Sequence, residues 1–330
     1  MTTATSAPPV TRAAVTWRDL LWLTWRQHRL SIAVMAGFAA VLAAVALAMA
    51  AIVRSSGSAD HELPDGSGFV GTTQMLTLTP MLVGAVVAVF WAAPLVSREF
   101  EQRTHLVVWS QDVSPSRWLV GKVGLLLVPA LLIGCLYPLA VRALVLAVMA
   151  VQGEFQLFNL FRDELFELSP ATQAGYVVFG FGLGLAASVL TRRTVVSMGV
   201  TIGLYLVTRV LVANSWRPYF VPPLRRLVQF RPYSDPGSFP PDIPDNSYLV
   251  KAGVADAAGN ELPTPEVCNG NSGGSYLDCV RDQGVVNRFV DFQPPSRLVG
   301  FQLFEGAVFL VLGLVLLYVA YSRVRRLHRL

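Results

Sequence analysis

The sequence predicts an all-α membrane protein with six transmembrane helices and with both termini in the cytoplasm. Three observations lead to this fold class: the composition, the spacing of six apolar runs, and the distribution of basic residues between those runs. Of the 330 residues, 53% are hydrophobic and only 14% are charged, whereas a soluble domain carries roughly a quarter charged residues. Much of the surface is therefore expected to face something other than water.

Six runs of residues are long and apolar enough, or nearly so, to cross a hydrocarbon core, which takes about 20 predominantly apolar residues. The first run is too long for the apolar core of a signal peptide, so we expect it to be retained as a span. The sixth run is short, and a start near Phe301 would place Glu305 within or at the edge of the bilayer. The runs cover approximately Leu30–Val53, Gln74–Val96, Leu119–Val151, Ala171–Leu190, Val195–Val212 and Gly306–Tyr321.

Basic residues test this count, because they gather in the cytoplasmic loops of membrane proteins. With the N-terminus inside, the two short outer loops hold one basic residue each, Arg54 and Arg162. Basic residues that lie between apolar runs differ from the single basic patch of a nucleic-acid-binding protein, so no nucleic-acid partner is expected. The predicted cytoplasmic segments carry Arg12, Arg18, Arg26, Arg29, Arg98, Arg103, Arg117, Lys122, Arg192, Arg193, Arg323, Arg325, Arg326 and Arg329.

The chain divides into a series of regions on this basis. They are a disordered N-terminus (1–15), an amphipathic interfacial helix (16–31), five spans (30–212) with a cytoplasmic segment (97–122), an extracytoplasmic loop (213–300), the sixth span (301–322) and a basic tail (323–330). The interfacial helix is predicted because Trp17, Leu20, Leu21, Thr24 and Trp25 share one helical face. A plain flank of the first span is the alternative. In both cases the expected anchors to the lipid headgroups are Trp17, Trp22, Trp25, Arg26 and Arg29.

The long outer loop contains two of the three cysteines, Cys268 and Cys279. Disulfides persist in oxidising compartments, so we expect a disulfide between them; two free thiols are the alternative. The third, Cys135, lies in the third run and is expected to pack as a small apolar residue. The four histidines are scattered without the spacing of metal ligands, so no metal site is expected.

The cytoplasmic segment Ser97–Lys122, SREFEQRTHLVVWSQDVSPSRWLVGK, is longer than a reversal of the chain requires. It begins with charged residues, continues through an apolar stretch, and breaks at Ser114–Pro115, where Pro115 suits the first turn of a helix and Ser114 its N-cap. We therefore expect a helix, a turn, and a second helix that enters the membrane. Such a structured segment suggests a surface for a partner, and an ordinary interfacial helix is the alternative.

At this point the sequence resembles a known family, the type-2 permeases of ATP-binding-cassette (ABC) exporters, in a form often seen in actinobacteria. The resemblance rests on TWRQHR before the first span, on the segment Ser97–Lys122, on FQPPSRLVGFQLFEG before the last span, and on the six-span layout. It implies a coupling helix that begins at Arg98–Glu101 and docks on a cytoplasmic ATPase. The implied coupling residues are Arg98, Glu99, Phe100, Glu101, Arg103 and Thr104.

The resemblance also implies the partners and the location. Two copies of a cytoplasmic ABC ATPase would bind ATP and magnesium, and a second copy of the chain or a related permease would complete the complex in the bacterial plasma membrane. The chain lacks the GxxxxGK[ST] sequence that cradles nucleotide phosphates, so it is expected to bind no cofactor and to be no enzyme itself. In such permeases the first, second and fifth spans line a central path, and the segment before the last span gates it.

Two helical faces suit that path. One lies on the second span and the other on the fifth, and packing between helices is the alternative for each residue. Two charges in the spans, Arg142 and Arg209, are expected to snorkel to the outer interface, with a role in binding an anionic substrate as the alternative for Arg209. Gly180, Gly184 and Ser188 predict close packing of the fourth span. The path residues are Gln74, Thr77 and Met81, and Met198, Thr201, Tyr205 and Thr208.

The leading hypothesis is a permease subunit that exports a hydrophobic or amphipathic substrate, such as a drug, an antibiotic, a peptide or a lipid. Two alternatives come from other classes. A non-transporting sensor or immunity protein would use the outer loop and need no ATPase. A membrane-embedded hydrolase would need clustered acids or histidines at one depth, and the sequence shows no such cluster.

Overall fold

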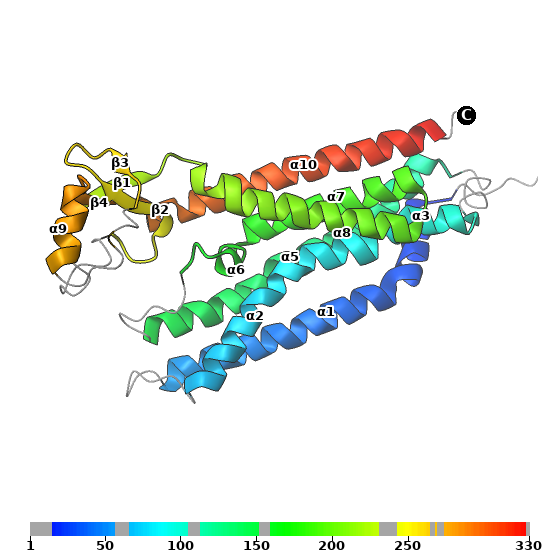
Figure 1. The fold of residues 1–330 in the computed structure, drawn as a ribbon. Coiled ribbons are helices and arrows are strands. Elements are labelled where there is room, and N and C mark those ends of the chain that lie inside the picture. Colours follow the sequence, from blue (N-terminus) through cyan, green and yellow to red (C-terminus); the bar gives the residue numbers. More distant parts are fainter. Residues whose placement is uncertain are drawn as a thin grey trace, which may run out of the picture.

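The computed structural model describes residues 15–56, 66–104, 113–151, 159–230, 243–264, 268 and 274–327. Long helices form an elongated bundle, and a small sheet lies at one end of it (Figure 1). We call this end the sheet end. The first described helix begins, and the last one finishes, at the opposite end, which we call the terminal end. The predictions for residues 1–14, for 105–112 of the cytoplasmic segment and for 328–330 of the tail lie outside the described residues.

Six helical stretches are long and apolar enough to cross a membrane, which confirms the predicted number of spans. The first and third spans are single helices, α1 (Trp17–Ser56) and α5 (Pro115–Val151). The second span is built from α2 (Gly66–Val86), the π-helix η1 (Val87–Ala92) and α3 (Pro94–Glu101). The fourth is α7 (Pro170–Thr191). The fifth is α8 (Thr194–Leu211), extended by the π-helix η2 (Val212–Trp216) and the 3-10 helix η3 (Arg217–Tyr219), and the sixth is α10 (Leu298–Leu327) after the 3-10 helix η5 (Pro295–Arg297).

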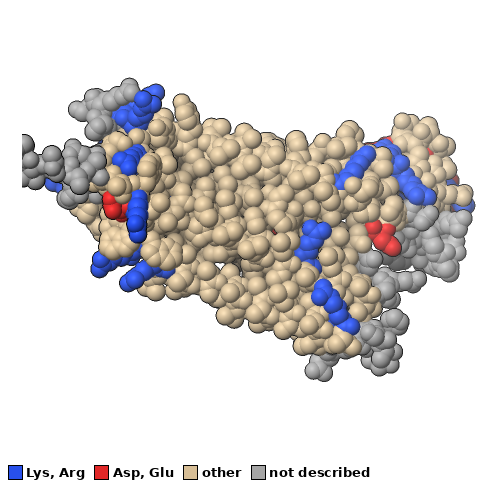
Figure 2. Space-filling model, turned by 180° about the vertical axis from the view of Figure 1, so that it is seen from behind, with Lys and Arg blue, Asp and Glu red and all other residues tan. Residues whose placement is uncertain are grey.

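The outer surface of the bundle suits a hydrocarbon solvent. Large apolar side chains stand exposed along the spans, for example Phe38, Leu132, Leu136 and Leu314. In the space-filling view a broad tan band separates the basic side chains of the two ends (Figure 2). Since an apolar surface of this extent is unfavourable in water, the chain is a multi-pass membrane protein.

The helix α7 forms the centre of the bundle. In its most apolar window 83% of the residues are buried, against 56% or less in the other spans. Glycines let its neighbours approach, because a Cβ atom on Gly182 would lie 2.5 Å from the backbone oxygen of Gly313 in α10. A Cβ atom on Gly180 would lie 2.8 Å from the backbone oxygen of Gly84. The predicted close packing of the fourth span is therefore confirmed. The helix α7 packs against α10 on one side and against the second span on another.

The structure of the first span corrects the predicted boundary between an interfacial helix (16–31) and the span itself. Residues 17–31 do not form a separate helix, because α1 runs without interruption from Trp17 to Ser56 and the first glycine of this stretch is Gly37. The predicted apolar face also splits, since Leu20 and Thr24 are buried against the bundle while Trp17 and Trp25 are exposed. The position of these tryptophans relative to the headgroups stays a prediction.

The start of α5 follows from its sequence. Pro115 occupies the first turn, where its missing N–H is no loss, and the backbone N–H of Arg117 donates to the Ser114 hydroxyl at 3.4 Å. This is the N-cap that the sequence predicts at Ser114–Pro115. The helix then continues through Pro129 and Pro138 and packs along α1 for most of its length.

The region between the fifth and sixth spans corrects the all-α prediction. It contains a four-stranded antiparallel sheet in the order β1-β4-β2-β3, built from β1 (Leu224–Gln229), β2 (Tyr248–Ala255), β3 (Glu261–Leu262) and β4 (Asn287–Gln293). The central strand β4 is buried at every position from Phe289 to Gln293, so both of its faces are covered there. At the edge, hydrogen bonds from Lys251 and Arg225 lower the pKa of the Glu261 carboxyl. The sequence did not predict this sheet, because its strands are short runs within a long polar loop.

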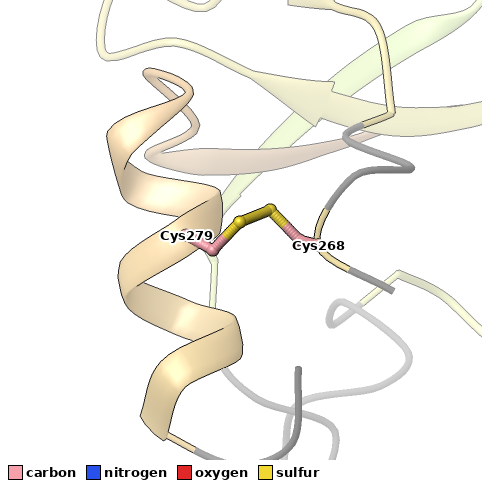
Figure 3. The surroundings of a disulfide bond; sticks show 2 residues. All are labelled: Cys268 and Cys279. Carbon is pink, nitrogen blue, oxygen red and sulfur yellow. A yellow bond between two sulfur atoms is a disulfide. The ribbon is translucent and has the colours of Figure 1, made fainter. Parts of the chain in front are cut away.

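A helix with a disulfide covers part of this sheet. Cys279 lies on α9 (Gly274–Asp282), and its sulfur is bonded to that of Cys268, with the two Cα atoms 5.9 Å apart (Figure 3). Both cysteines belong to a small apolar core with Val254, Val280 and Val285. The sheet end thus has a core of its own, which the disulfide closes.

Polar contacts join the sheet to the bundle. The Gln293 side-chain amide, at the end of β4, donates to the backbone oxygens of Pro218 and Val221 at 3.0 and 2.6 Å. Arg297 donates to the backbone oxygen of Pro222 at 2.9 Å, and Asn159 donates to that of Ser247 at 2.9 Å. The strand that enters the sixth span is therefore attached to the segment that leaves the fifth.

Candidate functional site

The predicted coupling residues lie at the terminal end of the second span. Arg98 to Glu101 form the last turn of α3, and Gln102 and Arg103 form a turn in which Arg103 has a φ of 55°. A separate helix therefore does not begin at Arg98–Glu101, because no helix-breaking residue follows Pro94 and the span continues to Glu101. Any coupling helix would begin at or after Thr104, and residues 105–112 lie outside the described part.

Two carboxylates on this last turn attach α3 to two other spans. Glu99 forms an ion pair with Lys122 of α5, and the side chains are 16% and 4% exposed. Glu101 accepts two hydrogen bonds from Thr194, one from its backbone N–H at 2.9 Å and one from its hydroxyl at 2.7 Å. Since Thr194 is the first residue of α8, Glu101 caps that helix from a distant part of the chain and places a negative charge at its N-terminus.

Ala93, Ser97 and Phe100, in or just before α3, also contact the fourth and fifth spans and the connection between them. The backbone N–H of Ser97 donates to the Ser188 hydroxyl of α7 at 2.7 Å, and the Ser197 hydroxyl of α8 donates to the backbone oxygen of Ala93 at 2.7 Å. The Arg192 guanidinium lies 5.5 Å from the ring centre of Phe100. A displacement of α3 must therefore displace the terminal ends of α5, α7 and α8.

The predicted path residues of the fifth span turn largely into the protomer. Thr201 and Tyr205 are buried, and the Tyr205 ring stacks on Phe179 of α7 with the ring centres 5.9 Å apart. The Tyr205 hydroxyl occupies the space that a Cβ atom on Gly84 would need. Met198 and Thr208 on the same helix are half-buried.

The predicted path residues of the second span do not share one exposure. Gln74 is exposed, Met81 is half-buried, and Thr77 is buried with its hydroxyl donating to the backbone oxygen of Gln74 at 2.7 Å. The structure thus brings Tyr205 of the fifth span to Gly84 of the second, and it does not bring all seven predicted residues to one open face. Within a single protomer, Thr201 and Tyr205 pack between helices, which is the alternative to a role in the substrate path.

A network of buried charges lies nearer the sheet end. Arg217 in η3 donates two hydrogen bonds to Glu305 of α10, at 2.8 and 2.9 Å, and each side chain is 1% exposed. Glu305 also accepts a hydrogen bond from the Tyr176 hydroxyl of α7. Arg209 of α8 forms a second ion pair, with Glu167, which precedes α7. The network joins the fourth, fifth and sixth spans.

The network corrects the prediction that Arg209 snorkels. Its side chain is 10% exposed, and its guanidinium lies 3.3 Å from the ring centre of Tyr176. Glu167 supplies a counter-charge inside the protein, so the side chain has no reason to reach the interface. The π-helix η2 lies between Arg209 and Arg217.

These features, six spans and a polar turn that links their ends, can be compared with known proteins. A family profile described as ABC-2 membrane transporter related matches residues 32–217, which is more than half of the chain. The chain belongs to this family. No curated protein and no solved structure matches the chain. The matched residues of this ABC-2-related protein cover the first five spans and end at Arg217, before the sheet.

Family membership makes the chain a membrane component of a transporter and agrees with the resemblance found in its sequence. Sequence reasoning placed Glu305 at the membrane edge, but it did not pair it with Arg217, which was assigned to the outer loop. A signal existed, because ionisable residues in or beside spans are expected to pair with one another. Choosing the pairs required knowing which helices are neighbours, and helical periodicity alone does not give that.

Proposed function

We propose that the chain is the permease subunit of an ABC exporter. It moves a hydrophobic or amphipathic substrate out of the cytoplasm or the inner leaflet, with ATP hydrolysed by a separate cytoplasmic subunit. Two copies of that ATPase bind a pair of permeases, which are two copies of this chain or this chain and a relative. Under this proposal the terminal end is cytoplasmic, which is supported by the basic residues of the short segments at that end, against one each in the two short outer loops.

The observation that carries the proposal is the attachment of the second half of α3, from Ser97 to Glu101, to three other spans. Glu99 holds α5 and Glu101 caps α8, and Ser97 contacts α7. A force applied to the segment after Glu101 would therefore reach most of the bundle. When the two ATPases close on ATP, such a force would switch the pair of permeases between an inward-open and an outward-open arrangement.

The first test is purification of the tagged chain from its native host in mild detergent, with mass spectrometry of the proteins that co-elute. We expect a near-stoichiometric cytoplasmic protein with a P-loop sequence. The variant Glu101→Arg should reduce that protein at least tenfold, because it removes the cap of α8 and reverses the charge beside the coupling segment. The matched control is Arg325→Glu, a charge reversal on an exposed residue of α10 at the same end.

Two results would contradict the proposal. One is elution without any nucleotide-binding partner. The other is equal recovery of the partner with Glu101→Arg and with the wild type. Either result would favour a non-transporting receptor that uses the sheet end, because that alternative needs no ATPase.

A further inference from the structure

A cavity of about 490 Å³ opens between the first, second and third spans at the terminal end. This volume is within the range of sites that bind small molecules, roughly 300–1,000 Å³. We call it the terminal cavity. Its walls come from α1, η1, α3, the turn after α3, and α5, and its lining residues are Gln27, His28, Ser31, Phe90, Trp91, Pro94, Leu95, Arg98, Glu99, Gln102, Thr104 and Lys122.

One side of the terminal cavity is rich in hydrogen-bond donors and has an excess of positive charge. Arg98 and Lys122 are cations, while Glu99 is the one carboxylate among the described lining residues and already pairs with Lys122. No carboxylate in the described part of the chain forms an ion pair with Arg98, whose side chain is exposed. His28 adds a ring N–H donor from α1, and the neighbouring Ser31 hydroxyl donates to the His28 backbone oxygen at 2.8 Å. Guanidinium and ammonium groups together with such donors are the usual ligands of a phosphate.

The other side of the cavity is apolar. Trp91, Pro94 and Leu95 form this wall, and Phe90 beside them is 62% exposed. Phe90 precedes the end of α3 at Glu101 by eleven residues, which corresponds to about 16 Å of helical rise. The cavity thus extends from a polar mouth at the end of the bundle to an apolar wall well inside the span.

We propose that the terminal cavity binds an amphiphile with a net-negative phosphate head, whose phosphate contacts Arg98 and Lys122 and whose apolar chain lies along Phe90 and Trp91. The shared chemistry is that of an anionic phospholipid or another lipid-linked phosphate. The binding of this amphiphile to the chain does not depend on the proposed function. Its further role as a transported substrate on its way into the complex does rest on that function.

An acidic side chain of the ATPase is a competing occupant, because the cavity adjoins the coupling segment. The apolar wall speaks against it. A carboxylate on the surface of a soluble protein would satisfy Arg98 at the mouth and leave the wall around Phe90 and Trp91 unfilled. An amphiphile fills both parts, since one molecule carries a charged head for Arg98 and Lys122 and an apolar chain for Phe90 and Trp91.

The test measures ligand binding to the purified full chain in a neutral detergent, by the shift of its thermal unfolding midpoint during titration. The probes are dioctanoyl phosphatidylglycerol, dioctanoyl phosphatidylcholine and inorganic phosphate. We expect binding of phosphatidylglycerol at least tenfold tighter than of the other two. Arg98→Gln should weaken it about tenfold, as the loss of one charge-assisted contact predicts. The matched control Arg29→Gln, an exposed arginine beside His28 that does not line the cavity, should change it less than twofold.

A second variant tests the apolar wall. Phe90→Ser changes an exposed side chain, so folding should be kept, and it should weaken phosphatidylglycerol binding while leaving any binding of inorganic phosphate unchanged.

Equal binding of the two lipids, or an equal effect of Arg29→Gln and Arg98→Gln, would overturn the proposal. Tight binding of inorganic phosphate that Phe90→Ser does not affect would assign the cavity to a free phosphate compound. A lack of lipid binding, with co-purification of the ATPase lost in Arg98→Gln, would assign it to the partner. Because no ATPase is present in the binding measurement, its result is independent of the proposed function.

Discussion

At the scale of single residues, four buried charges near the sheet end form two matched pairs. Arg217 lies against Glu305 and Arg209 against Glu167, all of them buried. Burying an isolated charge costs far more than burying a pair whose hydrogen bonds are satisfied. Arg217–Glu305 fixes the exit of the fifth span to the start of the sixth, and Arg209–Glu167 fixes the fifth span to the segment before the fourth.

The pair Arg217–Glu305 allows a direct test. Arg217→Met leaves the Glu305 carboxylate buried without its main counter-charge, and we expect a loss of about 3–5 kcal/mol in the free energy of unfolding. The double variant Arg217→Met with Glu305→Leu should recover much of that loss, because no unpaired charge remains. Thermal unfolding midpoints of the wild type, both single variants and the double variant in one detergent give the comparison. Losses that simply add in the double variant would show that the two side chains do not depend on each other.

At the scale of elements, the fold depends on how closely α7 approaches its neighbours. Sequence periodicity located this span and its small residues Gly180, Gly184 and Ser188, and the structure uses all three in contacts with the second span. What periodicity could not show is the break of the second span into α2, η1 and α3. A π-helix depends on a local change of hydrogen bonding, and no residue type in Val87–Ala92 marks it.

Two alanine substitutions compare glycines of neighbouring spans. In α7, a Cβ atom on Gly184 would lie 2.8 Å from the Cβ atom of Ala92 and 2.9 Å from the backbone nitrogen of Ala93, so Gly184→Ala must push α7 and the second span apart. We expect a loss of about 1–3 kcal/mol, as for other overpacked sites. In α8, Gly199 has nothing within 4 Å, so Gly199→Ala should be neutral or slightly stabilising. Thermal unfolding in detergent measures both, and equal losses would contradict this account of the packing.

At the scale of the whole molecule, the sequence predicted the spans well and the rest of the chain unevenly. The apolar runs were sufficient for six spans because a bilayer demands a minimum apolar length from each. The same reasoning had no means to find the sheet. Its strands are short, and β1 carries Arg225 and Arg226 with mostly exposed side chains. For the candidate site, the sequence predicted which residues belong to it but not what they contact, because the partners of Glu99 and Glu101 are distant in sequence.

The disulfide and the distribution of basic residues together predict which end of the molecule faces outward. Cys268 and Cys279 are bonded at the sheet end, and a disulfide persists in an oxidising compartment, so the sheet end should be extracytoplasmic. In intact cells, a membrane-impermeant reductant followed by an impermeant maleimide should label these two cysteines in a Cys135→Ser background. A cysteine introduced as Ser322→Cys, near the end of α10, should be labelled only after the membrane is permeabilised. Labelling of Ser322→Cys in intact cells, with the native pair protected, would reverse the orientation. The terminal cavity and the end of α3 would then lie outside the cell, where no cytoplasmic ATPase could reach them.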